Sequence, residues 1–512
     1  MNPAATGQKN GRKGCKESER TARGNESAGG RIGVDKASSN WPRSFGRRTC
    51  MGARSSFSKR RPADTPTGRH ASPPMSQKKI SVVTATNLVV ANMVGTGVFT
   101  SLGFQVAGIT SDFALIALWV VGGIAALCGA LSYAELATAL PRSGGEYHYL
   151  SRIYHPSVGF LSGWISVVVG FPAPIALAGI AFGEYFKIFT PGISPMLVSL
   201  LVIWIITLVH LFGVRVEEMF QNGSTFLKIG LILVLIVAGL LIANPQQLNM
   251  NPGPKVVETL VSPPFAISLV YVMYAYSGWN AATYITEEVR NSAKNVPWAL
   301  LLGTVAVAVL YLLLNYVFLL TTPKSVLSGQ LEVGLLAGQA IFGPTGGKIV
   351  SALISAGLIA TISAMAWIGP RITKRMAEDL PKLHLLGKTS AHGTPYVAII
   401  LQVVIVTILV ATGTFQRVLI YTQFSLLLSS FLTVLGLIVL RIRQPKLERP
   451  YKVWGYPVTP IFFLLITLHM MRYVILDKPT ESLLGLLTVI AGLIIYFFTR
   501  EPGRKIYSAP LK

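Results

Sequence analysis

The sequence is poor in cysteine and in charged residues. Its 512 residues include three cysteines, and Asp, Glu, Lys and Arg together make up 13% of the chain, whereas hydrophobic residues make up 51%. Cys15 and Cys50 precede the first long hydrophobic run and Cys128 lies inside a later one, so no disulfide framework is indicated. The low charge argues against a soluble enzyme and is typical of a protein that crosses the membrane many times.

The common motifs of catalysis are also missing. The sequence has no nucleotide-binding loop and no nucleophile elbow, and His210 and the other histidines lack metal-ligand spacing. No hydrophobic run offers a paired Asp, a Ser/Lys dyad or a His/Glu metal set, which disfavours an intramembrane enzyme. We therefore expect no cofactor and no metal.

Basic residues outnumber acidic ones chiefly at the N-terminus. Residues 1–79 hold 18 Lys and Arg against 5 Asp and Glu, a net +13, while the other 433 residues carry +11 of the total +24. Because the later basic residues fall in loops, the charge does not indicate a nucleic-acid partner. Residues 1–78 lack apolar periodicity, so we expect a disordered tail, or a gene-model extension if Met75 is the functional start. Residues 501–512 are expected to form a short cytoplasmic tail.

Hydrophobic runs long enough to span a bilayer recur from Ile80 onward. They predict an all-α polytopic membrane protein whose membrane domain covers 79–500. About twelve helices are expected, at 80–106, 113–140, 158–186, 195–213, 219–243, 264–289, 297–321, 346–372, 395–413, 418–440, 457–476 and 482–499. Arg and Lys concentrate in alternate loops, so the positive-inside rule places both termini in the cytoplasm of a plasma or bacterial inner membrane.

Two of these runs are interrupted near their middle. Gly95, Thr96 and Gly97 disfavour a continuous helix, because glycine loses the most backbone entropy on ordering and threonine is stiff. A second half-helix starting there would direct unpaired N–H groups at a polar cavity, which suits a carboxylate. Small residues can instead mark close helix packing. The second interruption, at 274–280, favours a midplane substrate site, since transporters carry such breaks in corresponding halves.

Four groups of residues resemble the amino acid, polyamine and organocation transporter superfamily, and within it the L-type amino acid transporter branch. In chain order they are Gly-Thr-Gly-Val-Phe at 95–99, Tyr-Ala-Glu-Leu at 133–136 with Pro-Arg-Ser-Gly-Gly-Glu-Tyr at 141–147, Tyr-Ser-Gly-Trp-Asn at 276–280 with Thr-Glu-Glu-Val at 286–289, and Arg-Pro-Tyr-Lys-Val-Trp at 449–454.

The resemblance implies a 5+5 inverted repeat with broken first and sixth helices. It also implies secondary transport of amino acids by alternating access; a polyamine or basic amino acid exchanger and a receptor that does not transport are alternatives. Expected partners are the amino acid, membrane lipids and protons. Animal members of this branch pair with a heavy chain through a cysteine in the loop that corresponds to 187–195, and this loop has none. We therefore expect no disulfide-linked heavy chain.

The ends of the half-helices suggest roles around the two breaks, and the resemblance adds the role of Tyr274. Amides at Thr96 and Gly97 would hold the substrate carboxylate, with Gly95 permitting the bend. Carbonyls near Tyr274, Ala275 and Ser277 would accept its ammonium at the negative end of a half-helix. Tyr274 is either a lid over the substrate or a packing residue.

Other side chains have two interpretations each. Met93, Tyr276 and Trp279 would shape the pocket or pack in the core.

Four acidic residues lie in or at the ends of the predicted spans. None lies at the middle of a span, which favours neutral substrates. Glu184 is expected to anchor the end of a helix, and Glu135 is expected to lie toward the cytoplasm. Glu287 and Glu288 are expected to pair with Arg142 or Arg371 in a cytoplasmic gate.

Lys228 lies either deep in the fifth helix or near its end, where it can reach the interface. The resemblance favours the deep position, since sodium-independent relatives carry a lysine in place of a sodium ion. Its expected partners are carbonyls beside Gly95 and the hydroxyls of Thr361 or Ser363. Burial favours a neutral amine and carbonyl contacts favour an ammonium, so the residue is a candidate for proton coupling in sodium-independent transport.

Overall fold

The structure, a computed structural model, describes residues 79–212, 217–242, 245–390 and 393–499. The chain divides into two units, Met1–Pro74 and Met75–Lys512, and all described helices belong to the second unit. The predicted basic tail at 1–78 and the predicted C-terminal tail at 501–512 lie outside the described residues.

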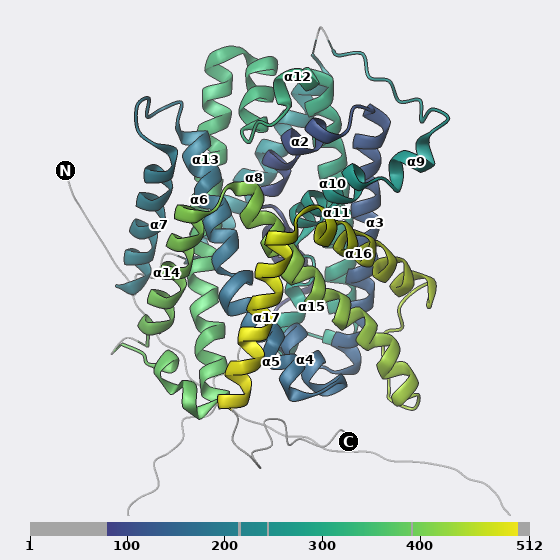
Figure 1. The fold of residues 1–512 in the computed structure, drawn as a ribbon, viewed down its shortest axis with the longest axis vertical. Helices are drawn as coiled ribbons and strands as arrows, with labels where there is room; N and C mark the ends of the chain where they lie inside the picture. Colours follow the sequence, from purple (N-terminus) through teal and green to yellow (C-terminus); the bar gives the residue numbers. More distant parts are fainter. Residues whose placement is uncertain (1–78, 213–216, 243–244, 391–392, 500–512) are drawn as a thin grey trace, which may run out of the picture. The chain divides into compact units, whose positions relative to one another are not determined.

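The second unit is built from helices (Figure 1). Its first half contains α1 (Val82–Met93), α2 (Gly97–Gly108), α3 (Asp112–Ala139), α4 (Gly145–Ile153), α5 (Pro156–Ile165), η1 (Ser166–Gly170), α6 (Pro172–Phe186), α7 (Pro195–Leu211) and α8 (Glu217–Leu240). The rest contains α9 (Val256–Leu260), α10 (Pro263–Tyr276), η2 (Ala281–Glu288), α11 (Ser292–Thr321), α12 (Lys324–Leu327), α13 (Val333–Asp379), η3 (Pro381–Gly387), α14 (Tyr396–Thr412), α15 (Phe415–Arg443), α16 (Val458–Asp477) and α17 (Pro479–Thr499).

Each of the twelve predicted spans coincides with one helix or with consecutive helices of this set. Within the described residues, eight helical segments are long and apolar enough to cross a membrane alone, and the bent pair of α1 and α2 makes a ninth. Two further apolar helices, α7 and α14, have 17 residues each. The predicted all-α polytopic fold is therefore confirmed.

Glycine redirects the chain within one predicted span and just before another. The span predicted at 264–289 is helical as α10 only to Tyr276, because Gly278 adopts φ 100° and an α-helix cannot continue through that conformation. The chain resumes as the 3₁₀-helix η2. Gly343, at φ 74°, likewise separates the start of α13 from the predicted span at 346–372.

Helices from the two halves pack in matching pairs. α3 packs along α11, α6 packs along α13, and α2 packs against α10. Just before α1, the N–H of Ile80 donates to Glu288 O and its carbonyl accepts from the Arg290 N–H. The start of the first broken helix thus lies beside the end of the second. The two run in opposite directions, as an inverted repeat requires.

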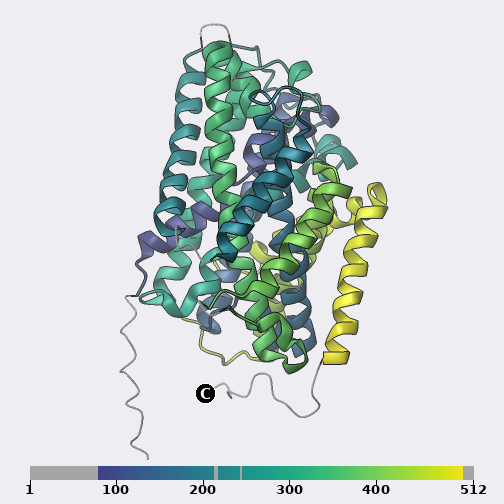
Figure 2. The same ribbon diagram turned by 90° about the vertical axis from the view of Figure 1, so that its left-hand side faces the viewer.

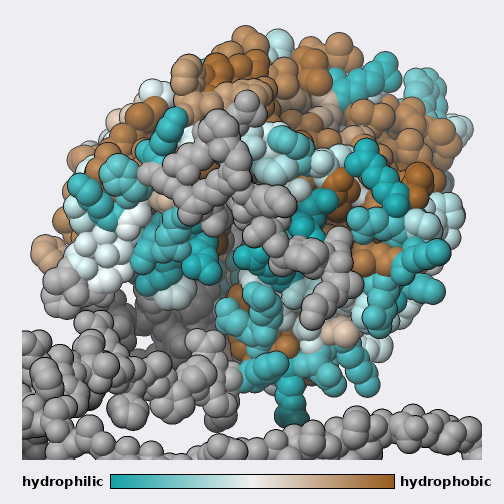
Figure 3. All heavy atoms as spheres, turned by 90° about the horizontal axis from the view of Figure 1, so that it is seen from below, coloured by the Kyte–Doolittle hydropathy of each residue, from teal (hydrophilic) through white to brown (hydrophobic). Residues whose placement is uncertain are grey.

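The bundle has two ends that we name by their short helices. In Figure 1 the α4 end lies at the bottom and the α12 end at the top, and Figure 2 shows the long helices running between them. Arg142 precedes α4, Arg152 lies in its last turn, and Arg290 follows η2. Seen from the α4 end, hydrophilic side chains gather on this face and hydrophobic ones lie along its edge (Figure 3). Outward-facing residues of the last two helices are apolar, for example Leu465, Leu483 and Ile490.

Candidate substrate-binding site

The first break separates α1 from α2 by three residues and bends the pair by 41°. Val94 leaves the helical conformation at φ −77° and ψ 85°, and the Gly95 N–H donates to Met93 O at 2.9 Å. Gly97 begins the new helix. The first N–H groups of a helix have no intrahelical acceptor and carry the positive end of its dipole. The break therefore offers donors to an anion.

The second break follows α10. Ser277 ends the helix at φ −58° and ψ 149°, and its N–H donates to Tyr274 O at 3.0 Å. Gly278 follows in the left-handed region, and a Cβ atom there would lie 2.8 Å from the carbonyl carbon of Asn92 in α1. Glycine is thus required both by the backbone conformation and by the close approach of α1. The last carbonyls of α10, at its negative end, are suited to a cation.

The two breaks lie directly against each other. A Cβ atom on Gly97 would lie 2.5 Å from Ala275 Cα, so the start of α2 touches the backbone of α10. The hydroxyls of Thr96 and Tyr274 are 2.7 Å apart and buried. Residues predicted to bind the two ends of one amino acid are therefore brought together, although the Thr96 side chain is engaged by Tyr274.

Gly95 has open space beside it, unlike Gly97. It is partly exposed, and the nearest atom to a Cβ placed there is Met93 O at 4.0 Å. This makes Gly95 the position in the first break with room next to it.

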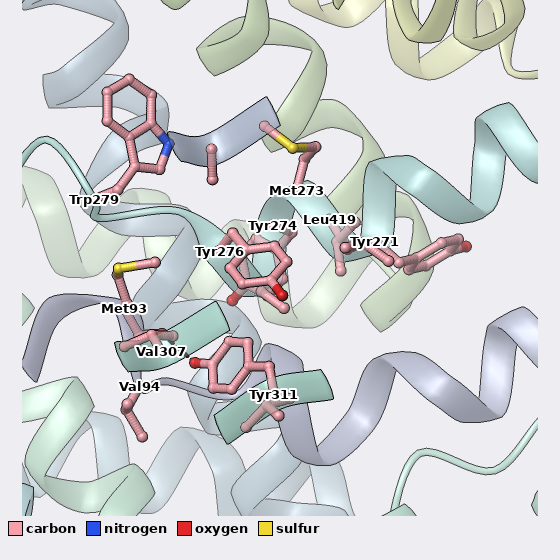
Figure 4. Packing of buried hydrophobic residues seen from close by; sticks show 14 of the residues in the cluster. Met93, Val94, Tyr271, Met273, Tyr274, Tyr276, Trp279, Val307, Tyr311 and Leu419 are labelled. Carbon is pink, nitrogen blue, oxygen red and sulfur yellow. Dashed lines mark hydrogen bonds between the residues drawn. The ribbon is translucent and has the colours of Figure 1, made fainter. Parts of the chain in front are cut away.

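Most of the predicted pocket side chains are engaged in helix packing. Tyr276 is fully buried, donates to Trp119 O at 3.1 Å and packs against the ring of Tyr311. Trp279 packs between α3 and α16. Met93 is buried, and its carbonyl accepts the Tyr311 hydroxyl at 2.7 Å. Figure 4 shows the rings of Tyr276 and Tyr311 together near Met93, with the Trp279 ring apart from them.

Lys228 links the first break to α13. Its Nζ donates to Val94 O at 3.1 Å and to Thr361 Oγ1 at 2.8 Å, and the residue is buried. Ser363, the other predicted partner of Lys228, is hydrogen-bonded elsewhere. Its Oγ lies 3.0 Å from Nε2 of His210 in α7, because it faces a different side of α13 from Thr361.

The predicted acids occupy different settings. Glu287 and Ser143 bond reciprocally, since each backbone N–H donates to the other side chain, at 3.3 and 3.0 Å. Glu288 contributes its carbonyl to the bridge with Ile80. Glu184 lies 3.8 Å from Lys187 at the end of α6.

Glu135 is completely buried near the end of α3. Its carboxylate accepts two hydrogen bonds from Arg441, at 2.8 and 2.6 Å, lies 3.3 Å from Arg449 Nε, and accepts the Val453 N–H at 2.7 Å. It therefore joins α3 to α15 and to the loop that follows α15.

Sequence reasoning missed Glu146. This residue was noted only as part of the 141–147 group, but its carboxylate is buried and reaches α3, α5 and α15. The available signal was the Gly144–Gly145 pair, since both glycines have positive φ and turn the first residues of α4 inward.

The fold and the two adjoining breaks define a class, the multi-span transporters whose substrate site lies between discontinuous helices. Residues 80–499 match the amino acid permease family, and the chain belongs to that family. It is therefore a membrane transporter of amino acids and not an enzyme.

Curated relatives agree with this assignment. The b(0,+)-type amino acid transporter 1 of Mus musculus is 31% identical over 433 residues, which is 82% of this chain and 88% of the relative. The serine/threonine exchanger SteT of Bacillus subtilis is 26% identical over 429 residues, or 82% and 96%. The human cystine/glutamate transporter is 25% identical over 430 residues, or 82% and 85%.

Proposed function

We propose that the chain exchanges neutral amino acids across the cytoplasmic membrane without sodium. The observation that carries this proposal is the contact between the two breaks, where Gly97 meets Ala275 and Thr96 meets Tyr274. N–H groups at the start of α2 bind the substrate carboxylate, and the last carbonyls of α10 bind its ammonium. Open space beside Gly95 supports this position for the substrate.

The Bacillus subtilis relative is named an exchanger, which supports exchange as the mode of transport. Independence from sodium is supported by Lys228, whose ammonium lies between Val94 O and Thr361 Oγ1. A sodium ion placed among the same oxygen atoms would be repelled by that charge. A change in the protonation of Lys228 would couple protons to transport.

The α4 end is the cytoplasmic side in this proposal. Basic residues beside α4 and η2 support that orientation through the positive-inside rule, and it places both chain termini in the cytoplasm. The apolar outward faces of α16 and α17 contact lipid. No disulfide-linked heavy chain takes part, because the 187–195 loop has no cysteine.

Counterflow in proteoliposomes tests the function. Purified full-length protein is reconstituted with an unlabelled amino acid inside, and uptake of a labelled panel is measured in sodium and in choline buffers, with and without a proton gradient. We expect saturable uptake of neutral amino acids that requires internal substrate and is equal in both buffers. Uptake of no amino acid, or uptake only with sodium, would overturn the proposal.

A cationic substrate is the second candidate, and one observation favours it. Glu146 places a buried carboxylate within 3.4 Å of Asn280, two residues after Gly278 of the second break. The same panel therefore includes arginine, lysine, putrescine and agmatine. Strong competition by the two amines, which lack a carboxylate, would favour polyamine transport over the carboxylate site.

A further inference from the structure

Glu146 lies at the start of α4, where a two-glycine turn directs it into the protein. Gly144 and Gly145 have φ of 125° and 52°, and a Cβ atom on Gly145 would lie 2.6 Å from the ring of Tyr284 in η2. The turn therefore seats α4 against η2. A carboxylate in the first turn of a helix also interacts favourably with the helix dipole.

Neutral donors from three helices, and from the residue that precedes η2, surround this carboxylate. Its two strongest bonds come from the Tyr133 hydroxyl of α3 and from Ser429 Oγ of α15, the latter at 2.6 Å. Longer contacts of 3.3 to 3.4 Å come from the side chains of Ser430, Ser162 and Asn280. Ser429 is at the middle of α15 and Asn280 immediately precedes η2. The carboxylate thus joins helix ends to the interior of the bundle.

The described contacts of this carboxylate include no cation. His148, two residues along α4, does not supply one, because burial and the charges of Arg142 and Arg152 lower its pKa to about 4. Tyr133, Tyr149 and Tyr284 are the other titratable side chains around it. A buried carboxylate without a counter-ion is stabilised by its hydrogen bonds. Its charge is therefore costly to bury unless the donors stay in contact with it.

We propose that Glu146 is a positioning residue of the transport cycle. Its carboxylate holds η2 against α3 and α15, and this set of bonds separates when the path from the breaks to the α4 end opens. The proposal rests on the transport function proposed above. Replacing the charge with an amide weakens the strongest bonds, so Glu146→Gln shifts the protein toward the state open at the α4 end.

A buried cysteine in η2 can report this opening. Cys15, Cys50 and Cys128 are changed to serine, and Thr283, which is completely buried in η2, is changed to cysteine. The rate of labelling by a membrane-impermeant maleimide is then measured on purified full-length protein. We expect Glu146→Gln to raise that rate about tenfold, the scale of one hydrogen bond to a charged group. A saturating amino acid should slow labelling, and Glu146→Asp should restore part of the wild-type rate.

Two controls separate opening from general loosening. Glu378→Gln removes an exposed acid of α13 that pairs with Arg375, and it should leave the labelling rate unchanged. Ser101→Cys places the reporter at a buried position in α2, on the other side of the breaks, where Glu146→Gln should not accelerate labelling. Equal acceleration at both reporters, or none at Thr283→Cys, would overturn the proposal. Absence of amino acid uptake by the wild type would instead refute the proposed function.

Discussion

The hydrogen bond between Thr96 and Tyr274 joins the two breaks directly, and its removal gives a quantitative prediction. The two hydroxyls are 2.7 Å apart, and both residues are buried. Tyr274→Phe and Thr96→Val each delete one hydroxyl while keeping the shape of the side chain. If the bond holds the breaks together around substrate, both changes should favour release.

The size of the effect follows from the kind of bond. A neutral hydrogen bond contributes about 0.5–1.5 kcal/mol, and a factor of ten in an equilibrium corresponds to about 1.4 kcal/mol. Each single variant should therefore raise the rate of substrate efflux roughly two- to tenfold. Tyr274→Ala also removes the ring, so it should have the larger effect if the ring covers the substrate.

A double-mutant cycle is the assay. Efflux of preloaded amino acid from proteoliposomes is measured for the wild type, the two single variants and the double variant. We expect the double variant to resemble either single one, with a coupling energy of about 0.5–1.5 kcal/mol. Additive effects of the two changes would refute a shared bond, and unchanged efflux from Tyr274→Phe would show that the hydroxyl plays no part.

Three further predictions concern separate contacts. Gly97→Ala should lower stability by about 1–3 kcal/mol and abolish uptake, because its methyl group meets the Ala275 backbone. Gly95→Ala should have the unfolding temperature of the wild type but bind the substrate more weakly. Lys228→Met keeps the stem that packs on Gly357 and should reduce uptake at least about tenfold, the scale of one hydrogen bond to a charged group, without making uptake sodium-dependent. Glu135→Gln should lower stability by about 3–5 kcal/mol in a thermal unfolding assay, since two guanidinium groups lose their counter-charge, while Glu378→Gln should not.

The spans and the two breaks were predictable because their causes are local. Hydrophobic run length sets where a helix can cross the bilayer, and glycine beside threonine or serine weakens the helix wherever it occurs. The interruption at 274–280 was predicted, but the residue at which α10 ends was not, because it depends on the positive φ of Gly278 and on how closely α1 approaches that residue. Sequence periodicity carries neither kind of information.

The partners of polar side chains were less predictable than their positions. Thr361 and Ser363 are two residues apart on α13, and both seemed suitable for Lys228, but only Thr361 faces it. Two residues of a helix are separated by about 200° around its axis. The choice therefore required the rotation of α13, which packing against α6 and α8 determines.

Two carboxylates near the α4 end show why the number of acids in a span is a poor guide to function. Glu135 is compensated by Arg441 and Arg449, and separating them would leave charges buried and unpaired, so this contact favours one fixed arrangement. Among the described residues Glu146 is held by neutral donors, and hydroxyl groups can rotate to other acceptors at a smaller cost. Electrostatics therefore favours motion around Glu146 and rigidity around Glu135, although both residues are buried acids at the same end of the bundle.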